Sequence, residues 1–140
     1  AEAEGYKGQG EDNKPEKLEE NGKQAAWRHT KKSNYLLKSN LDQLENILSL
    51  AEQNKWNILF VTTPAFHTYR EHLDQNQLKS TVEIISNLSL HNDNVKYYNL
   101  IDSPEFIKED FYDADHLSGK GAAKFSKILN NLIQKEFKSD

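Results

Sequence analysis

The sequence predicts an α/β fold in which parallel strands are joined through helices. Two short runs of β-forming residues alternate with longer segments whose apolar residues recur every three or four positions, the spacing of one helix face. The first run is apolar on both faces, as expected of a strand that helices cover on both sides. Strands connected through a helix run parallel. Because two strands are too few to complete such a sheet, we expect a partial three-layer α/β/α sandwich with parallel strands, incomplete in this chain.

The N-terminal segment, residues 1–24, is predicted to be disordered or a loop, and residues 25–140 to form the folded part. The apolar side chains of this segment are two Ala, one Tyr and one Leu. So little apolar surface does not offset the roughly 1–2 kcal/mol per residue that backbone ordering costs. An amphipathic helix is then expected from about residue 34 to 53, where Leu and Ile follow helical spacing.

The next two elements are predicted from their boundary signals. The run ILFVT at residues 58–62 indicates a strand, and Pro64 ends it because proline has no N–H for the ladder. Asp74 is expected to cap a second helix that runs down near residue 91, with Leu73 and Leu78 at the two hydrophobic-staple positions around it.

The C-terminal elements are a second strand and two helices. Residues 95–101 are the strand candidate, and a serine before Pro104 predicts a short helix near 104–110. Ser118 is expected to cap the last helix, whose apolar stripe continues to Phe137. This order places both strands between helices.

Composition excludes several classes of function. The 140 residues carry 18 Lys and Arg against 22 Asp and Glu, a net charge of −4 without a basic stripe, so no nucleic acid partner is expected. The longest apolar run, residues 58–61, is far shorter than the roughly 20 residues of a membrane span, and none is expected. The absence of Cys excludes disulfides and thiolate chemistry. Because the chain has no Met, we expect it to be a piece of a longer protein.

Two loops rich in titratable residues follow the predicted strands. In an open parallel sheet, ligands bind beyond the carboxyl ends of the strands, where residues 62–70 and 111–119 are both expected. The second loop contains Asp113 three residues before His116. On a turn, this carboxylate can fold back to accept the ring Nδ1 proton, which leaves Nε2 as a base. The same spacing also fits a loop acid beside a surface imidazole.

A metal site is not expected from these residues, nor is any other cofactor. His67 and His72 are five residues apart, which does not place both on one helix face. Asp115 adjoins His116, and in most backbones neighbouring side chains point in different directions. Asp113 is therefore assigned to the imidazole.

The string FYDADHLSGKGAAKFSKIL at residues 111–129 resembles the last block of the SGNH, or GDSL-type, hydrolase superfamily. The resemblance implies that Asp113 is the triad acid and His116 the general base, and that the fold is of the SGNH/flavodoxin-like kind. It further implies an ester substrate, in particular an O-acetylated carbohydrate, and a cell-envelope or extracellular location. The loop after the first strand would line the substrate cleft with Thr63, Pro64, His67 and Tyr69.

The sequence departs from this family at the nucleophile. The superfamily takes its serine from a Gly-Asp-Ser block, and no serine here follows Gly-Asp. Loss of a triad nucleophile costs on the order of 10⁴–10⁶ in rate, so this chain alone is expected to be inactive. An upstream segment or a second chain would then carry the serine. The alternative is a non-catalytic interaction or scaffold module of α/β fold, in which the Asp113–His116 pair only clamps a loop.

Overall fold

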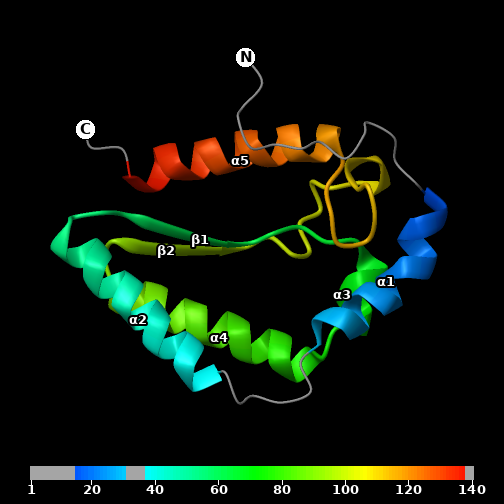
Figure 1. Ribbon diagram of the computed structural model, residues 1–140. Helices are drawn as coiled ribbons and strands as arrows, with labels where there is room; N and C mark the ends of the chain where they lie inside the picture. Colours follow the sequence, from blue (N-terminus) through cyan, green and yellow to red (C-terminus); the bar gives the residue numbers. More distant parts are fainter. Residues whose placement is uncertain (1–14, 31–36, 138–140) are drawn as a thin grey trace.

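A computed structural model describes residues 15–30 and 37–137 (Figure 1). In chain order these residues form α1 (Pro15–His29), α2 (Leu37–Gln53), β1 (Ile58–Thr62), α3 (His67–His72), α4 (Gln75–His91), β2 (Val95–Asn99), the 3₁₀ turn η1 (Lys108–Asp110) and α5 (Gly119–Phe137). None of the helices in these two described ranges is long and apolar enough to cross a membrane.

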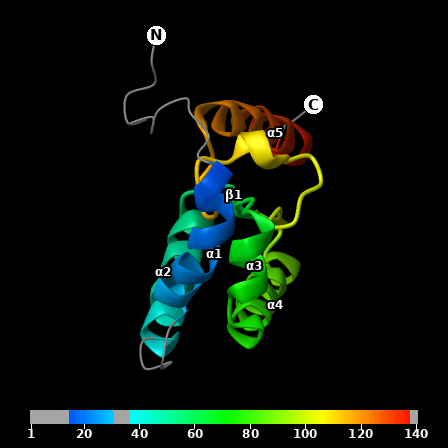
Figure 2. The same ribbon diagram turned by 90° about the vertical axis from the view of Figure 1, so that its right-hand side faces the viewer.

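The two strands form a parallel pair, as predicted. Ile58 of β1 lies opposite Val95 of β2, and the register continues to Thr62 opposite Asn99. Helix α5 lies on one side of the strands, and α2 and α4 lie on the other (Figures 1 and 2). The fold is therefore α/β, with helices on both faces of a small parallel sheet.

Most predicted elements are confirmed with small changes at their ends. Helix α2 covers the described part of the predicted helix, β1 has the predicted bounds, and β2 ends two residues earlier than expected. The Asp74 cap is present, because a carboxylate oxygen of Asp74 accepts a hydrogen bond of 2.9 Å from the backbone N–H of Gln77. The Ser118 cap is also present, since the N–H of Gly121 donates to the Ser118 hydroxyl at 3.2 Å.

The prediction of a loop or disordered segment over residues 1–24 is wrong for residues 15–24, which belong to α1. Residues 1–14 lie outside the described part of the chain. The helix is stabilised by close packing rather than by large apolar side chains. Its face carries buried Leu18, Gly22, Ala25 and Ala26 at helical spacing, and this face packs against α3 (Figure 2).

Gly22 allows the backbones of α1 and α3 to approach closely. A Cβ at this position would lie 2.6 Å from the Cβ and from the carbonyl carbon of Thr68. The Thr68 hydroxyl donates a hydrogen bond to the Leu18 carbonyl of α1. This contact brings the end of α1 close to the carboxyl ends of the strands.

Two further local predictions need correction. Residues 67–70, expected within a loop, belong to the short helix α3 (His67–His72). The helix expected near 104–110 is reduced to η1, because the N–H of Phe106 bonds back to the Ser103 carbonyl in a turn that encloses Pro104. Only the last three residues close a 3₁₀ turn, in which the Asp110 carboxylate accepts from the Ile107 N–H at 3.0 Å.

Candidate active site

The loop that carries Asp113 and His116 is closed by its own backbone. Phe111 and Leu117 form an antiparallel bridge, and the Tyr112 N–H donates to the His116 carbonyl at 3.0 Å. Inside this closed loop, an oxygen of Asp113 accepts from the N–H of Asp115 at 3.2 Å. The turn therefore brings the two ends of the Asp-x-x-His motif together.

The base of the loop is fixed to the start of α5. The backbone N–H of Ser118 donates to the Asp110 carbonyl at 2.9 Å, and Gly121 lies so close to Asp110 that a Cβ there would be 2.8 Å from its carbonyl carbon. The buried Asp110 carboxylate forms an ion pair with Lys124. Burial is the largest single influence and disfavours the ionised form, but the hydrogen bonds from Lys124 and from the Ile107 N–H and the charges of Lys124 and Lys120 together lower the pKa of Asp110.

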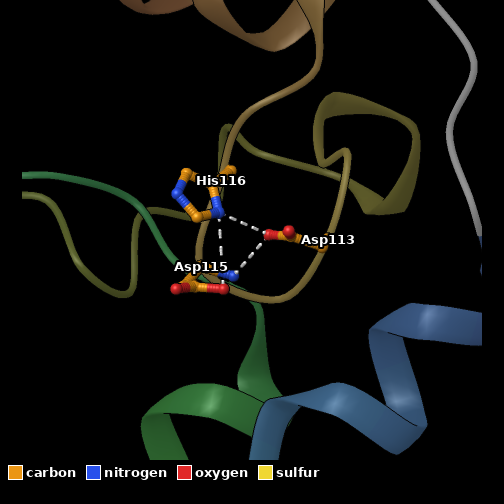
Figure 3. Close-up of side chains that lie close together, drawn as sticks. All are labelled: Asp113, Asp115 and His116. Atoms are coloured by element: carbon orange, nitrogen blue, oxygen red, sulfur yellow. Dashed lines mark hydrogen bonds and ion pairs between the residues drawn. The ribbon is translucent and has the colours of Figure 1, made fainter. Parts of the chain in front are cut away.

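Asp113 and His116 form the pair that the sequence predicts (Figure 3). His116 Nδ1 lies 2.9 Å from Asp113 Oδ1, and the other ring nitrogen lies on the side of the ring away from Asp113. The Asp113 side chain is 24% exposed and that of His116 is 63% exposed. The acid is thus partly shielded behind the imidazole, while the imidazole itself remains accessible.

Asp115 also faces His116, contrary to the expectation that it points elsewhere. Its Oδ1 lies 3.5 Å from His116 Nδ1, and its side chain is only 9% exposed. The turn centred on Ala114 folds both acids toward the ring (Figure 3). Burial, followed by the nearby charge of Asp113, raises the pKa of Asp115, while His116 and His29 partly oppose this rise.

These three side chains are close enough to hold a metal ion. One ligand atom from each of Asp113, Asp115 and His116 lies within 4.8 Å of the others. Of the two ring nitrogens of His116 that could ligate an ion, Nδ1 is the one that pairs with Asp113. A proton and a cation on this nitrogen would therefore exclude each other.

His29 and Tyr69 extend the polar cluster from the other side. His29 Nδ1 lies 2.9 Å from the Tyr69 hydroxyl and 3.8 Å from Asp115 Oδ2, and the two rings meet edge to face. Burial and the charge of Asp115 raise the pKa of Tyr69, so its hydroxyl stays protonated at neutral pH. Asp115 consequently lies between two imidazoles, one from α1 and one from the loop before α5.

A pocket of about 280 Å³ joins these groups at the carboxyl ends of the strands. Its polar lining comes from the cluster and from the end of β1, and its apolar lining comes from the segments that follow the strands. The lining residues are His29, Thr62, Thr63, Ala65, Tyr69, Leu73, Leu78, Ile101, Asp115 and His116. Among the residues that the structure describes, no serine lines this pocket.

Of the four residues predicted to line the cleft, the structure brings two to His116. Thr63 and Tyr69 line the same pocket as the imidazole. Pro64 and His67 instead line a separate pocket of about 140 Å³ on the side of η1. His67 belongs to α3, lies 3.4 Å from a carboxylate oxygen of Glu71, and is not among the lining residues of the pocket of His116.

The charges around His116 favour its protonated form. Partial burial of the ring lowers its pKa, but the hydrogen bond and charge of Asp113, together with the charge of Asp115, raise the pKa above the ordinary 6.5. An imidazole with a free Nε2, a carboxylate on Nδ1 and a raised pKa has the features of a general base.

Neither His29 nor the apolar lining is predictable as part of the pocket from sequence spacing. The two histidines of the pocket are 87 positions apart, so no local spacing relates them. A signal for α1 did exist, since Leu18, Gly22, Ala25 and Ala26 follow helical spacing.

The chain belongs to an uncharacterised protein family, whose family model matches residues 7–138. No curated protein and no solved structure matches it.

Proposed function

We propose that this chain supplies the histidine base and its aspartate partner to an SGNH-like ester hydrolase or O-acyl(acetyl)transferase. His116 is the general base, Asp113 orients it, and the reacting serine comes from an upstream segment or a second chain. The observation that supports this most strongly is the 2.9 Å contact between His116 Nδ1 and Asp113 Oδ1, in a pocket at the carboxyl ends of parallel strands.

The geometry suits proton transfer from a hydroxyl. With Nδ1 hydrogen-bonded to Asp113, the tautomer is fixed and the lone pair lies on Nε2. Nε2 would take the proton of the attacking serine, and the carboxylates of Asp113 and Asp115 would stabilise the imidazolium. The same imidazolium would return the proton to the leaving alcohol.

The serine of this proposal is not Ser118. Its side chain is buried, accepts a hydrogen bond from Gly121 as the helix cap, and donates to the Glu109 carbonyl at 3.1 Å. Its role in capping leaves it unsuited to attack a substrate. We include in the proposal that the segment with the nucleophile also adds parallel strands, because among the described residues each of β1 and β2 has only one neighbour. These strands would complete the three-layer sandwich.

The test compares ester hydrolysis by matched variants of the chain joined to its natural upstream sequence. Hydrolysis of a short-chain aryl ester is expected to fall on the order of 10⁴-fold or more in His116→Ala. His91→Ala is the control, because His91 is an exposed histidine near the opposite end of the sheet that contacts the Asn87 carbonyl. Equal turnover in the two variants would exclude His116 as the base.

A non-catalytic interaction module remains the second candidate, favoured by exposed apolar side chains. Leu90 is 79% exposed and Trp56 is 55% exposed. In that case the Asp113–His116 pair is only a loop clamp. Size-exclusion chromatography and hydrogen exchange then should show a well-protected monomer, and no upstream sequence should confer esterase activity that depends on His116.

A further inference from the structure

The lining of the pocket of His116 combines polar and apolar side chains. Asp115, His29 and Tyr69 line it together with the imidazole. Leu73, at the end of α3, Leu78, in the first turn of α4, and Ile101, which follows β2, are apolar lining residues, which we call the apolar wall. All three apolar side chains are only half-buried.

A hydrophobic staple formed by Leu73 and Leu78 around Asp74 explains why both residues are apolar. It does not explain why both line a pocket. A hydrophobic staple packs these two positions against each other to fix the start of a helix. Here both leucines also line a pocket that reaches His116. The corner between α3 and α4 is also held by the Gln75 side chain at the start of α4, whose Nε2 donates to the Arg70 carbonyl of α3 at 2.9 Å.

We propose that this apolar wall is the acyl subsite of the esterase site, and that Leu78 sets the length of the acyl group. The inference rests on the proposed function, because the ester carbonyl is placed beside His116. The occupant is the acyl chain of a neutral ester. A free carboxylate fits poorly, since Asp115 lines the pocket and Asp113 lies directly behind the imidazole.

The volume of the pocket matches a short acyl chain. At the roughly 30 Å³ that one water molecule occupies in the liquid, the volume of about 280 Å³ holds about nine non-hydrogen atoms. This is the size of methyl hexanoate. Each methylene that enters the apolar wall should improve binding about fourfold.

The experiment titrates the chain itself with methyl acetate, butyrate, hexanoate and octanoate, and follows leucine methyl signals by NMR. Affinity is expected to rise about fifteenfold for the two methylenes between acetate and butyrate, to rise again for hexanoate, and to stop rising at octanoate. The signals of Leu73 and Leu78 should shift. Equal affinity for all four esters would overturn the proposal.

Two opposite substitutions identify the residue that limits chain length. In Leu78→Ala, affinity is expected to keep rising with chain length up to octanoate. In Leu78→Phe, affinity is expected to stop rising at butyrate. Leu90→Ala is the control on the same helix, because Leu90 is 79% exposed and does not line this pocket. The same length profile in all three variants would refute the assignment to Leu78, and the methyl spectrum reports whether each variant is folded.

Failure of this inference is distinguishable from failure of the proposed function. The titration needs no nucleophile. If affinity rises with chain length but hydrolysis does not depend on His116, the acyl subsite is supported and the role of His116 as general base is refuted. Hydrolysis that depends on His116, combined with binding that ignores chain length, would retain the base and reject the subsite.

Discussion

Replacement of Asp113 by Asn tests the central pair in this chain alone. The substitution keeps the shape of the side chain and removes its charge. Because the hydrogen bond and charge of Asp113 raise the pKa of His116, Asp113→Asn is expected to lower that pKa. The change is measured by an NMR titration of the imidazole signals, with Asp93→Asn, a residue remote from the pocket, as control.

The same substitution has a pH-dependent effect on stability. A histidine whose pKa is raised on folding contributes stability that is fully present below its ordinary pKa of 6.5 and is lost as the pH rises through the folded value. Two unit charges 4 Å apart attract by about 1 kcal/mol in water. Since His116 is 63% exposed, solvent screening reduces the contribution of the pair to about 0.2–1 kcal/mol.

The assay is urea unfolding of the chain and of Asp113→Asn at about pH 5.5 and about pH 9. The variant should be destabilised more at the lower pH, and the difference between the two pH values should lie within about 1 kcal/mol. An effect that is equal at both values, together with an unchanged titration of His116, would show that the two side chains are not paired in solution.

Three other substitutions test the surroundings of the pair. Asp115→Asn should lower the pKa of His116 by NMR titration, but less than Asp113→Asn does, because Asp115 contributes charge without a short hydrogen bond; a larger effect would reverse the roles of the two acids. Gly121→Ala should cost about 1–3 kcal/mol in urea unfolding, since the added Cβ meets backbone atoms of Asp110, and a neutral result would contradict the close approach. Asp74→Ala should cost about 1 kcal/mol through loss of the α4 cap, and unchanged stability would show that this hydrogen bond is not formed in solution.

Elements with strong local signals were predictable from the sequence. Helix α4 has a capping aspartate at its start, and β1 is an apolar run that a proline ends. The stripe of α1 is a weak signal because, besides Leu18, the residues of α1 described as buried are Gly22, Ala25 and Ala26, which add little apolar surface. Helix α3 depends on tertiary contacts, among them the bond from the Phe66 N–H to the Ala114 carbonyl.

Some contacts of the candidate site likewise depend on local sequence, and others depend on tertiary packing. Asp113 and His116 are three residues apart, so their pairing depends only on a turn that their own backbone closes. His29 and Tyr69 are 40 residues apart and meet only because α1 packs on α3. Sequence spacing therefore predicts the contact between Asp113 and His116 but not the nearby imidazole of His29.

The loop that carries Asp113 and His116 should form before any contact with a further segment is made. The loop of the base is closed by the bridge between Phe111 and Leu117 and is fixed to α5 through Ser118, all within one stretch of described chain. The imidazole of His116 is thus oriented by residues of this stretch alone. Its titration and its pairing with Asp113 should be measurable in this chain by itself, whereas turnover should require the added nucleophile. A chain in which His116 became ordered only after the upstream sequence was added would contradict this local origin of the site.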